Sequence, residues 1–285
     1  MKEIEMIKDF GVCVHSGIHH ADELLSVAFL RATIDDNIVV YTLDTVPSDF
    51  KGIYIDCMFG ELDHHKYSDK FDTYEDGTVF ASFGKTVRKF GPETIGPKAT
   101  AILLNNFCRL MDGPDNGQGN VHNPLSYLIQ GINFSDEEDA MDDYIGFLTK
   151  MMRNLIKKVI TQADDEKNVH AFIRNNGLAH NKYIYFDKAY VWRDALNSYP
   201  DIQWVIFQDL TGRNKGAFIV QGVNLPDTFR SKAKFPANWA GHDKDYFESI
   251  GEPDIIFCHA SRSYLVTRTL ERAIKACNDS VSVNQ

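Results

Sequence analysis

Two short apolar runs near the N-terminus each lead directly into a cluster of histidines and carboxylates. Residues 11–14 precede three histidines, and residues 53–55 precede one aspartate and, shortly after it, an Asp-His-His triplet. Short apolar runs of this kind are typical of buried strands. In open α/β sheets, ligands bind in the crevice beyond the carboxyl ends of the strands. We therefore expect both clusters to meet at one edge of a sheet. Their members are His15, His19, His20, Asp22, Glu23, Asp56, Asp63, His64 and His65.

The pattern around these runs alternates between strands and helices. Asp22 and Glu23 open an apolar stretch over 22–30, and carboxylates favour the first turn of a helix. Further strands are predicted over 38–43 and 53–56, separated by short connections. This alternation predicts an α/β fold with a parallel sheet. The other helices predicted in this region are 80–90, 99–111 and 138–161, with a loop rich in Gly, Asn and Asp over 112–123.

A polar stretch over 162–181 separates this region from a second one of different character. Because 285 residues exceed the size at which a single core stops growing, roughly 250 residues, two domains are expected. We place the boundary near residue 172, which gives a domain 1–172 with both clusters and a smaller α/β domain 173–285. The strands predicted in the second domain are 183–186, 204–207, 217–220 and 255–258, followed by a helix over 265–277.

The composition of the chain indicates where the protein is located and which classes of partner it binds. Five cysteines with no close pair, and an N-terminus without a secretory pattern, predict a reducing, cytoplasmic location. No apolar run approaches the ~20 residues that cross a bilayer, so no membrane partner is expected. The formal charge of −10 disfavours broad binding of duplex nucleic acid, which relies on clustered Lys and Arg. Small or single-stranded substrates are favoured.

Mixed imidazole and carboxylate ligands indicate a particular class of metal. They suit Mn²⁺ or another borderline-hard ion, and the sequence offers no cysteine pair for a structural zinc site. Pairs of divalent ions in phosphoryl chemistry lie ~3.5–4 Å apart and need such mixed ligands. The clusters therefore predict two Mn²⁺ ions, with Mg²⁺ or Co²⁺ as alternatives.

Four motifs follow one another in a fixed order. They are His15-x4-His20-x-Asp22-Glu23, then Asp56, then Asp63-His64-His65, then Asp112-Gly113-Pro114-Asp115-Asn116-Gly117. This order resembles the DHH phosphoesterase superfamily and, within it, the melanocyte-proliferating-gene exonuclease family. That family carries His-Asn-Gly-x-x-His-x-Asp-Glu as its first motif, and Ser16 stands here in place of the Asn. The resemblance covers nearly the whole chain through Phe80-Ala81-Ser82-Phe83-Gly84, Phe235-Pro236-Ala237-Asn238-Trp239-Ala240-Gly241 and His259-Ala260-Ser261.

The resemblance implies a ligand set for two metal ions. His15 and His20 would bind one ion, and Asp22 would bind the other. Asp56 would bridge the two ions, and His64 would be a further ligand. The last carboxylate is Asp112 or, as the alternative, Asp115. The spacing of these two aspartates leaves the choice open.

The resemblance also implies catalytic residues around the ligands, which are Asp63, His65 and Asp115. Asp63 would orient a ligand imidazole, as metal-bound histidines usually require. His65 would contact the substrate phosphate. A water activated by the two ions would attack phosphorus, and no covalent nucleophile is required.

The second domain would supply contacts to phosphate and nucleotide. His259, Ser261, Arg262 and Arg268 are expected where a strand passes into a helix, and a helix N-terminus favours anions. Relatives often carry a glycine-rich loop after His-Ala-Ser, whereas this chain has Arg262-Ser263-Tyr264. Trp239 could stack on a base or pack as a lid, and the sequence leaves both open.

These inferences predict a dinuclear metallohydrolase that cleaves phosphodiester bonds. By resemblance it would be a 3′-5′ exonuclease on RNA or short oligonucleotides that releases nucleoside 5′-monophosphates. One alternative is a small-nucleotide phosphatase or cyclic-dinucleotide phosphodiesterase, because fold does not fix function. Another is a sensor that binds RNA or nucleotide without turnover. The sequence leaves the polarity of digestion and the oligomeric state open, a homodimer included.

Overall fold

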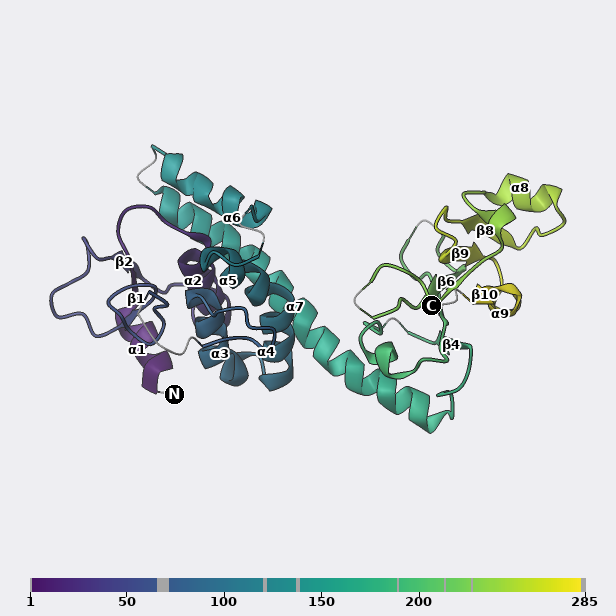
Figure 1. Ribbon diagram of the computed structural model, residues 1–285, viewed down its shortest axis with the longest axis horizontal. Coiled ribbons are helices and arrows are strands. Elements are labelled where there is room, and N and C mark those ends of the chain that lie inside the picture. Colours follow the sequence, from purple (N-terminus) through teal and green to yellow (C-terminus); the bar gives the residue numbers. More distant parts are fainter. Residues whose placement is uncertain are drawn as a thin grey trace. The chain divides into compact units, whose positions relative to one another are not determined.

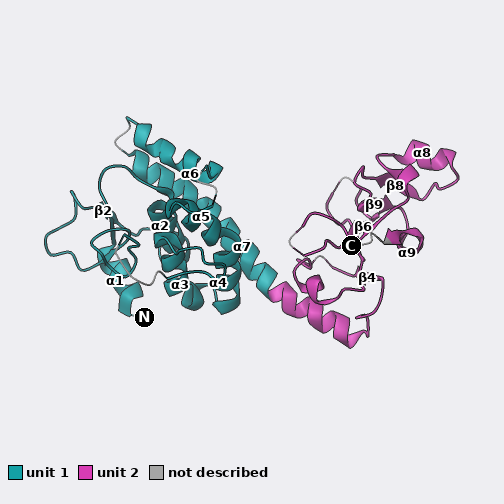
Figure 2. Ribbon diagram, viewed as in Figure 1, with its two compact units in different colours: residues 1–163 teal, residues 164–285 magenta. Residues whose placement is uncertain are grey.

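The computed structural model describes residues 2–65, 72–119, 122–136, 139–188, 190–212, 214–226 and 228–282 (Figure 1). The chain divides into two compact units, residues 1–163 and 164–285 (Figure 2). Both units combine helices with a sheet, in agreement with the predicted α/β class. The boundary expected near residue 172 lies inside helix α7 (Ala140–Asn175). Within the described ranges, no helix is long and apolar enough to cross a membrane.

Unit 1 contains the predicted parallel sheet. Its strands β1 (Val12–Val14), β2 (Val40–Thr42) and β3 (Ile53–Tyr54) lie in the order β2-β1-β3, and both pairs are parallel. All three residues of the central strand β1 are buried, which explains its purely apolar sequence. Because parallel strands end at the same edge of a sheet, the residues that follow β1 and β3 come close together.

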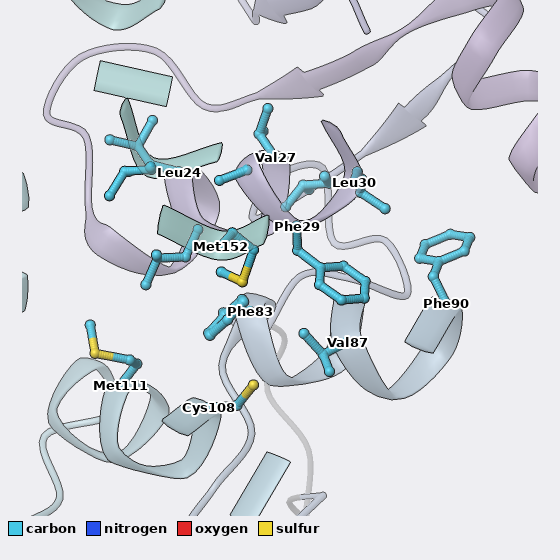
Figure 3. Close-up of a cluster of buried hydrophobic side chains, with 14 of the residues drawn as sticks. Leu24, Val27, Phe29, Leu30, Phe83, Val87, Phe90, Cys108, Met111 and Met152 are labelled. Atoms are coloured by element: carbon cyan, nitrogen blue, oxygen red, sulfur yellow. The ribbon is translucent and has the colours of Figure 1, made fainter. Parts of the chain in front are cut away.

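Helix α2 (Ala21–Thr33) lies at the centre of the core of unit 1. Its first ten residues are all buried, including Asp22 and Glu23. It packs against α3 (Ser82–Thr94), and Figure 3 shows Phe29 of α2 beside Phe83 and Val87 of α3. Two carboxylates thus enter the core with the helix. The remaining elements before α7 are α1 (Lys2–Phe10), α4 (Pro97–Leu103), the π-helix η1 (Leu104–Cys108), α5 (Arg109–Asp115), α6 (Pro124–Ile129) and the 3-10 helix η2 (Gln130–Phe134).

The loop predicted over 112–123 begins later than expected, because α5 continues to Asp115. Pro114 has no N–H and leaves the carbonyl of Leu110 without its helical donor. The side-chain amide of Asn123 donates to this carbonyl at 2.8 Å, so the helix tolerates the proline. Asp112 and Asp115 are therefore spaced by i and i+3 on a helix.

Helix α7 is longer than predicted. It was expected over 138–161, and Glu138 lies outside the described residues. The stretch after 161, expected as a connection, is helical as far as Asn175. Val169 and Ile173, spaced by i and i+4, are fully buried in a core cluster that includes strand residues of unit 2. Burial of these two side chains on one face of the helix stabilises helical structure in the otherwise polar stretch after residue 161.

Unit 2 contains a five-stranded mixed sheet in the order β4-β5-β6-β9-β8. β4 runs parallel to β5, and the other neighbours are antiparallel. A core cluster covers each face, since Trp204 and Ile206 of β5 belong to one cluster and Val205 to the other. The strands are β4 (Tyr183–Phe186), β5 (Trp204–Gln208), β6 (Phe218–Gly222), β8 (Ile255–Cys258) and β9 (Tyr264–Thr267). The smaller elements are η3 (Ala195–Ser198), β7 (Ala233–Lys234), η4 (Ala237–Trp239), α8 (Lys244–Ser249), α9 (Leu270–Asp279) and β10 (Val281–Ser282).

The C-terminal helix begins later than predicted, which corrects the expected helix over 265–277. Tyr264–Thr267 is strand β9, paired with both β6 and β8. Valine and threonine favour a strand with partners on both sides. Helix α9 starts only after Thr269, whose side chain accepts a hydrogen bond from the backbone N–H of Arg272.

Candidate metal centre

The histidines and carboxylates predicted to meet lie together at the carboxyl edge of the parallel sheet in unit 1. His15 follows β1, Asp56 follows β3, and His20 and Asp22 lie at the start of α2. Three groups of these residues offer ligand atoms within 4.8 Å of one another. The groups are His15, His20, Glu23 and Asp56; then Asp56, Asp63, His64 and His65; then His20, Asp22 and Asp115.

His64 contacts three carboxylates. Its Nδ1 lies 3.0 Å from Asp56 Oδ1 and 3.6 Å from Asp22 Oδ2. Its Nε2 lies 3.0 Å from Asp115 Oδ2. Burial alone would lower the pKa of His64, but Asp115 and Asp56 raise it to about 9. The carboxylates around this imidazole therefore create a site that favours positive charge.

Glu23 belongs to the site although the motif analysis assigned it no role. It is fully buried, and its Oε1 lies 3.2 Å from His15 Nε2 and 3.2 Å from His19 Nδ1. The backbone N–H of His20 donates to the same oxygen at 2.7 Å. Burial would raise the pKa of Glu23, yet the contacts with His15 and His19 bring it to about 2. The glutamate three residues after His20 is a sequence signal for this helix cap.

Asp63 holds the Asp-His-His segment in place. Its Oδ1 accepts the backbone N–H of His65 at 2.9 Å and lies 2.9 Å from His65 Nδ1. Its Oδ2 accepts the N–H of Phe59 at 2.8 Å. His65 Nδ1 also lies 3.3 Å from Asp56 Oδ1. Burial raises the pKa of Asp63, but the donors of His65 and Phe59 bring it below its ordinary value.

Ser82, at the start of α3, is a second residue that sequence reasoning missed. Its hydroxyl donates to Asp56 Oδ1 at 2.7 Å, and its N–H donates to Asp22 Oδ2 at 3.3 Å. Ser82 Oγ also lies 3.2 Å from His64 Nδ1. Ser82 thus touches three predicted ligands. The sequence places Ser82 in a motif, but no local pattern shows that a helix start reaches this edge.

Asp112 points away from these groups. Its Oδ2 accepts the hydroxyl of Tyr74 at 2.7 Å, and its Oδ1 accepts the N–H of Gly84 at 3.2 Å. Burial raises its pKa to about 7 against the effect of these donors. Among the described residues, the groups with metal-ligand spacing include Asp115 and leave out Asp112. The two aspartates lie about one turn apart on α5 and so meet different neighbours, Tyr74 and Gly84 for Asp112 and His64 for Asp115.

The donor atoms of this cluster fit a divalent cation. In the described part of the chain, four of its buried polar atoms make no hydrogen bond, namely His15 Nε2, Asp22 Oδ1, Glu23 Oε2 and Asp56 Oδ2. Three buried carboxylates with oxygens that accept no hydrogen bond are costly unless a cation compensates them. Burial, together with Asp56 and Asp115, raises the pKa of Asp22 well above its ordinary value. A cation bound here would satisfy these atoms, and the mixed N and O donors suit a borderline-hard ion.

The residues predicted to contact phosphate in unit 2 lie in a hairpin turn, which corrects the expected passage from strand to helix. The turn joins β8 to β9, with the N–H of Arg262 donating to His259 O at 2.8 Å. Arg262 has a φ of 60°. His259 and Ser261 are exposed, and His259 Nδ1 lies 2.7 Å from Ser261 Oγ. No helix N-terminus is available at this turn to hold an anion.

Two other residues predicted to bind substrate lie elsewhere in unit 2. Arg268 follows the far end of β9, where its Nε donates to Pro253 O at 3.1 Å. Trp239 is 6% exposed and packs in the core between Phe235 and Phe247. Trp239 therefore acts as a packed residue, and its ring faces are taken by protein.

Comparisons with known proteins connect this architecture to one family. The model of the MYG1_exonuc family, described as "Uncharacterised protein family (UPF0160)", matches residues 11–281. The chain belongs to this family. It is 22% identical over 340 residues to a protein named "MYG1 protein" from Dictyostelium discoideum, across 96% of this chain and 98% of that protein. No solved structure is significantly similar to the chain. The family match includes residues of both units.

Proposed function

We propose that this member of the family is a metal-dependent phosphodiester hydrolase of the DHH phosphoesterase type. Its reaction would be 3′-5′ exonuclease cleavage of single-stranded RNA or short oligonucleotides, with release of nucleoside 5′-monophosphates. One observation carries the proposal: Asp56 belongs to two adjacent groups of potential ligands, one with His15 and His20 and one with His64. A carboxylate shared in this way suits a pair of ions.

The proposed ligand assignment follows the family resemblance, and the contacts choose between the two aspartates that it leaves open. His15 and His20 would hold one ion, Asp22 and His64 the other, and Asp56 both. Asp115 completes the set in place of Asp112, because Asp115 lies beside His64 and Asp112 is hydrogen-bonded to Tyr74 and Gly84. Two divalent ions, Mn²⁺ or else Mg²⁺ or Co²⁺, would supply an activated water and neutralise charge at phosphorus.

Neighbouring side chains orient two of these ligands and the proposed phosphate contact His65. Asp63 fixes the ring of His65, whose side chain is 51% exposed and can meet a phosphate oxygen. Ser82 fixes Asp56 through a hydrogen bond of 2.7 Å. Glu23 fixes His15 through a contact of 3.2 Å. Such outer contacts hold ligand geometry and tune metal affinity.

Charge and exposure support the proposed substrate class. A formal charge of −10 opposes broad contact with duplex, so a single strand or a short oligonucleotide is favoured. In unit 2, the exposed pair His259 and Ser261 is the part of the predicted phosphate contact that we retain. Arg268 and Trp239 are no longer assigned to it.

The test is hydrolysis by metal-stripped protein with and without Mn²⁺. The substrates are end-labelled single-stranded RNA, a dinucleotide and a generic phosphodiester, with products followed over time. Stepwise shortening of RNA to 5′-mononucleotides from the 3′ end supports the exonuclease. Cleavage of only the small substrates would reassign the enzyme to small nucleotides. Absence of any Mn²⁺-dependent product would refute hydrolysis and favour a nucleotide or RNA sensor.

Matched variants connect the activity to the cluster. His64→Ala removes a proposed ligand of one ion and Asp56→Ala removes the proposed shared ligand, so each should abolish turnover while the protein stays folded. His180→Ala is the control, because the His180 side chain is 91% exposed and pairs with Asp201 in unit 2. Full activity in both cluster variants would remove the proposed site.

A further inference from the structure

An apolar wall lies beside the candidate metal centre in unit 1. A pocket of about 480 Å³ is lined by His15, His20 and Asp56 and also by Met58 and Phe59. Met58 is 63% exposed and Phe59 is 68% exposed. Pockets of roughly 300–1,000 Å³ commonly hold small ligands. The ligand atoms and the apolar wall therefore face one shared space.

The backbone that presents these two side chains is in a conformation rare for residues with a Cβ. Met58 has a φ of 61° and Phe59 a φ of 54°, and Asp56, two residues before Met58, has a φ of 57°. Glycine adopts such angles at less cost. The hydrogen bond from Phe59 N–H to Asp63 Oδ2 at 2.8 Å pins this turn to the Asp-His-His segment.

Packing of the core does not account for large side chains at these two positions. Both side chains are mostly exposed, so neither buries enough area to offset an unfavourable backbone. Strained backbone held by its surroundings is often found where a protein binds a ligand. An exposed thioether beside an exposed aromatic ring offers an adaptable apolar face. Single-stranded nucleic acids are held through such faces, because unstacked bases rest on aromatic side chains.

We propose that Met58 and Phe59 form a platform for the nucleobase next to the phosphate that is cleaved, an inference that rests on the proposed function. A phosphate held at the cluster places the adjoining nucleoside in the same pocket, whose lining includes both the proposed ligands and these two residues. Asp63 then has two tasks, since one carboxylate positions both His65 and the platform.

The test compares two probes and two variants. The first probe is a fluorescent dinucleotide with a non-hydrolysable linkage, and the second is the same molecule without the base nearest the linkage. Equilibrium anisotropy in Mn²⁺ gives the affinity for each. Met58→Gly/Phe59→Gly should weaken binding of the base-bearing probe about tenfold and so reduce the ratio of the two affinities. Phe147→Ala is the control, because Phe147 is a 57% exposed phenylalanine on α7 and should leave the ratio unchanged.

Chemical denaturation separates a binding role from a structural one. The glycine variant should be at least as stable as the unchanged protein, because it removes two unfavourable backbone conformations. A clear loss of stability, or an affinity ratio equal to that of the unchanged protein, would overturn the platform. Failure of the hydrolase proposal would give a different result, namely no Mn²⁺-dependent product from any phosphodiester. The ratio of the two probe affinities is measured without turnover, so the two failures can be distinguished.

Discussion

His64 Nε2 lies 3.0 Å from Asp115 Oδ2, which joins the Asp-His-His segment after β3 to the end of helix α5. The other nitrogen of the same ring lies 3.0 Å from Asp56 Oδ1. One imidazole thus connects two carboxylates that are 59 residues apart in the sequence, from Asp56 to Asp115. This contact favours Asp115 over Asp112 for the last carboxylate of the proposed ligand set.

Asp115→Asn should weaken metal binding more than Asp112→Asn does. The first change removes a carboxylate beside His64, and loss of a ligand should cost at least roughly 100-fold in affinity, because loss of outer contacts alone costs about 10- to 100-fold. The second change leaves the cluster intact. Calorimetric titration of Mn²⁺ into each metal-free variant measures the difference. A larger loss for Asp112→Asn would return that residue to the ligand set.

Glu23→Gln should weaken metal binding and lower the pKa of His15 while keeping the start of α2 intact. The contact with Glu23 raises the pKa of His15 to about 9 from an ordinary 6.5. Glutamine keeps one oxygen for the N–H of His20 but lacks the charge. We expect a loss of about 10- to 100-fold in Mn²⁺ affinity. NMR titration of the metal-free protein measures the pKa of His15.

Glu23→Ala separates the cap from the charge. Alanine removes the oxygen that the N–H of His20 donates to, so this variant should lose a further ~1 kcal/mol of stability relative to Glu23→Gln. Equal stability of the two variants would show that the cap contributes nothing. An unchanged pKa of His15 in Glu23→Gln would show that other groups hold its proton.

The sequence correctly predicts which residues meet at the carboxyl edge of the parallel sheet, because that inference needs only the direction of the strands. His15 and Asp56 each follow an apolar run, and parallel pairing then brings them together. The roles of Asp112 and Asp115 could not be separated, because residues spaced by i and i+3 share a helix face. Which of them reaches His64 depends on where α5 ends relative to the Asp-His-His segment. Glu23 and Ser82 were missed because their burial comes from the packing of α2 against α3. The role of Trp239 stayed open because packing in the core decides it. The helix predicted to begin at residue 265 was wrong because pairing with two neighbouring strands makes residues 264–267 a strand.

Asp112 should make the stability of the metal-free protein fall as the pH rises from about 4 to 7. Burial raises its pKa to about 7 from an ordinary 3.8, so the folded state binds the proton more tightly than the unfolded state. The protonated carboxyl of Asp112 therefore contributes its full stabilisation below the unfolded-state pKa of 3.8. This contribution is lost as the pH rises through the folded-state pKa of about 7. At about 1.4 kcal/mol per pKa unit, the change is a few kcal/mol.

Asp112→Asn is the matched variant, because its amide resembles the protonated acid. The free energy of unfolding of this variant should rise relative to the unchanged protein between pH 4 and 7 and then stay level. Urea denaturation at intervals of pH in the presence of a chelator provides the two curves. Curves that run parallel across this range would mean that Asp112 titrates alike in both states.

Mn²⁺ should stabilise the protein through the buried carboxylates. Asp22 and Asp56 are at most 2% exposed and each has an oxygen without a hydrogen bond, so a bound cation removes an electrostatic cost from the folded state alone. At 100 times the dissociation constant the gain is about 2.7 kcal/mol for one site. Calorimetric unfolding at increasing Mn²⁺ should therefore show a rising midpoint for the unchanged protein and for His180→Ala, but little rise for His64→Ala. Because a bound cation lowers the raised pKa of Asp22, binding should also release protons and strengthen as the pH rises. A midpoint that does not respond to Mn²⁺ in the unchanged protein would mean that the cluster holds its charges without a metal.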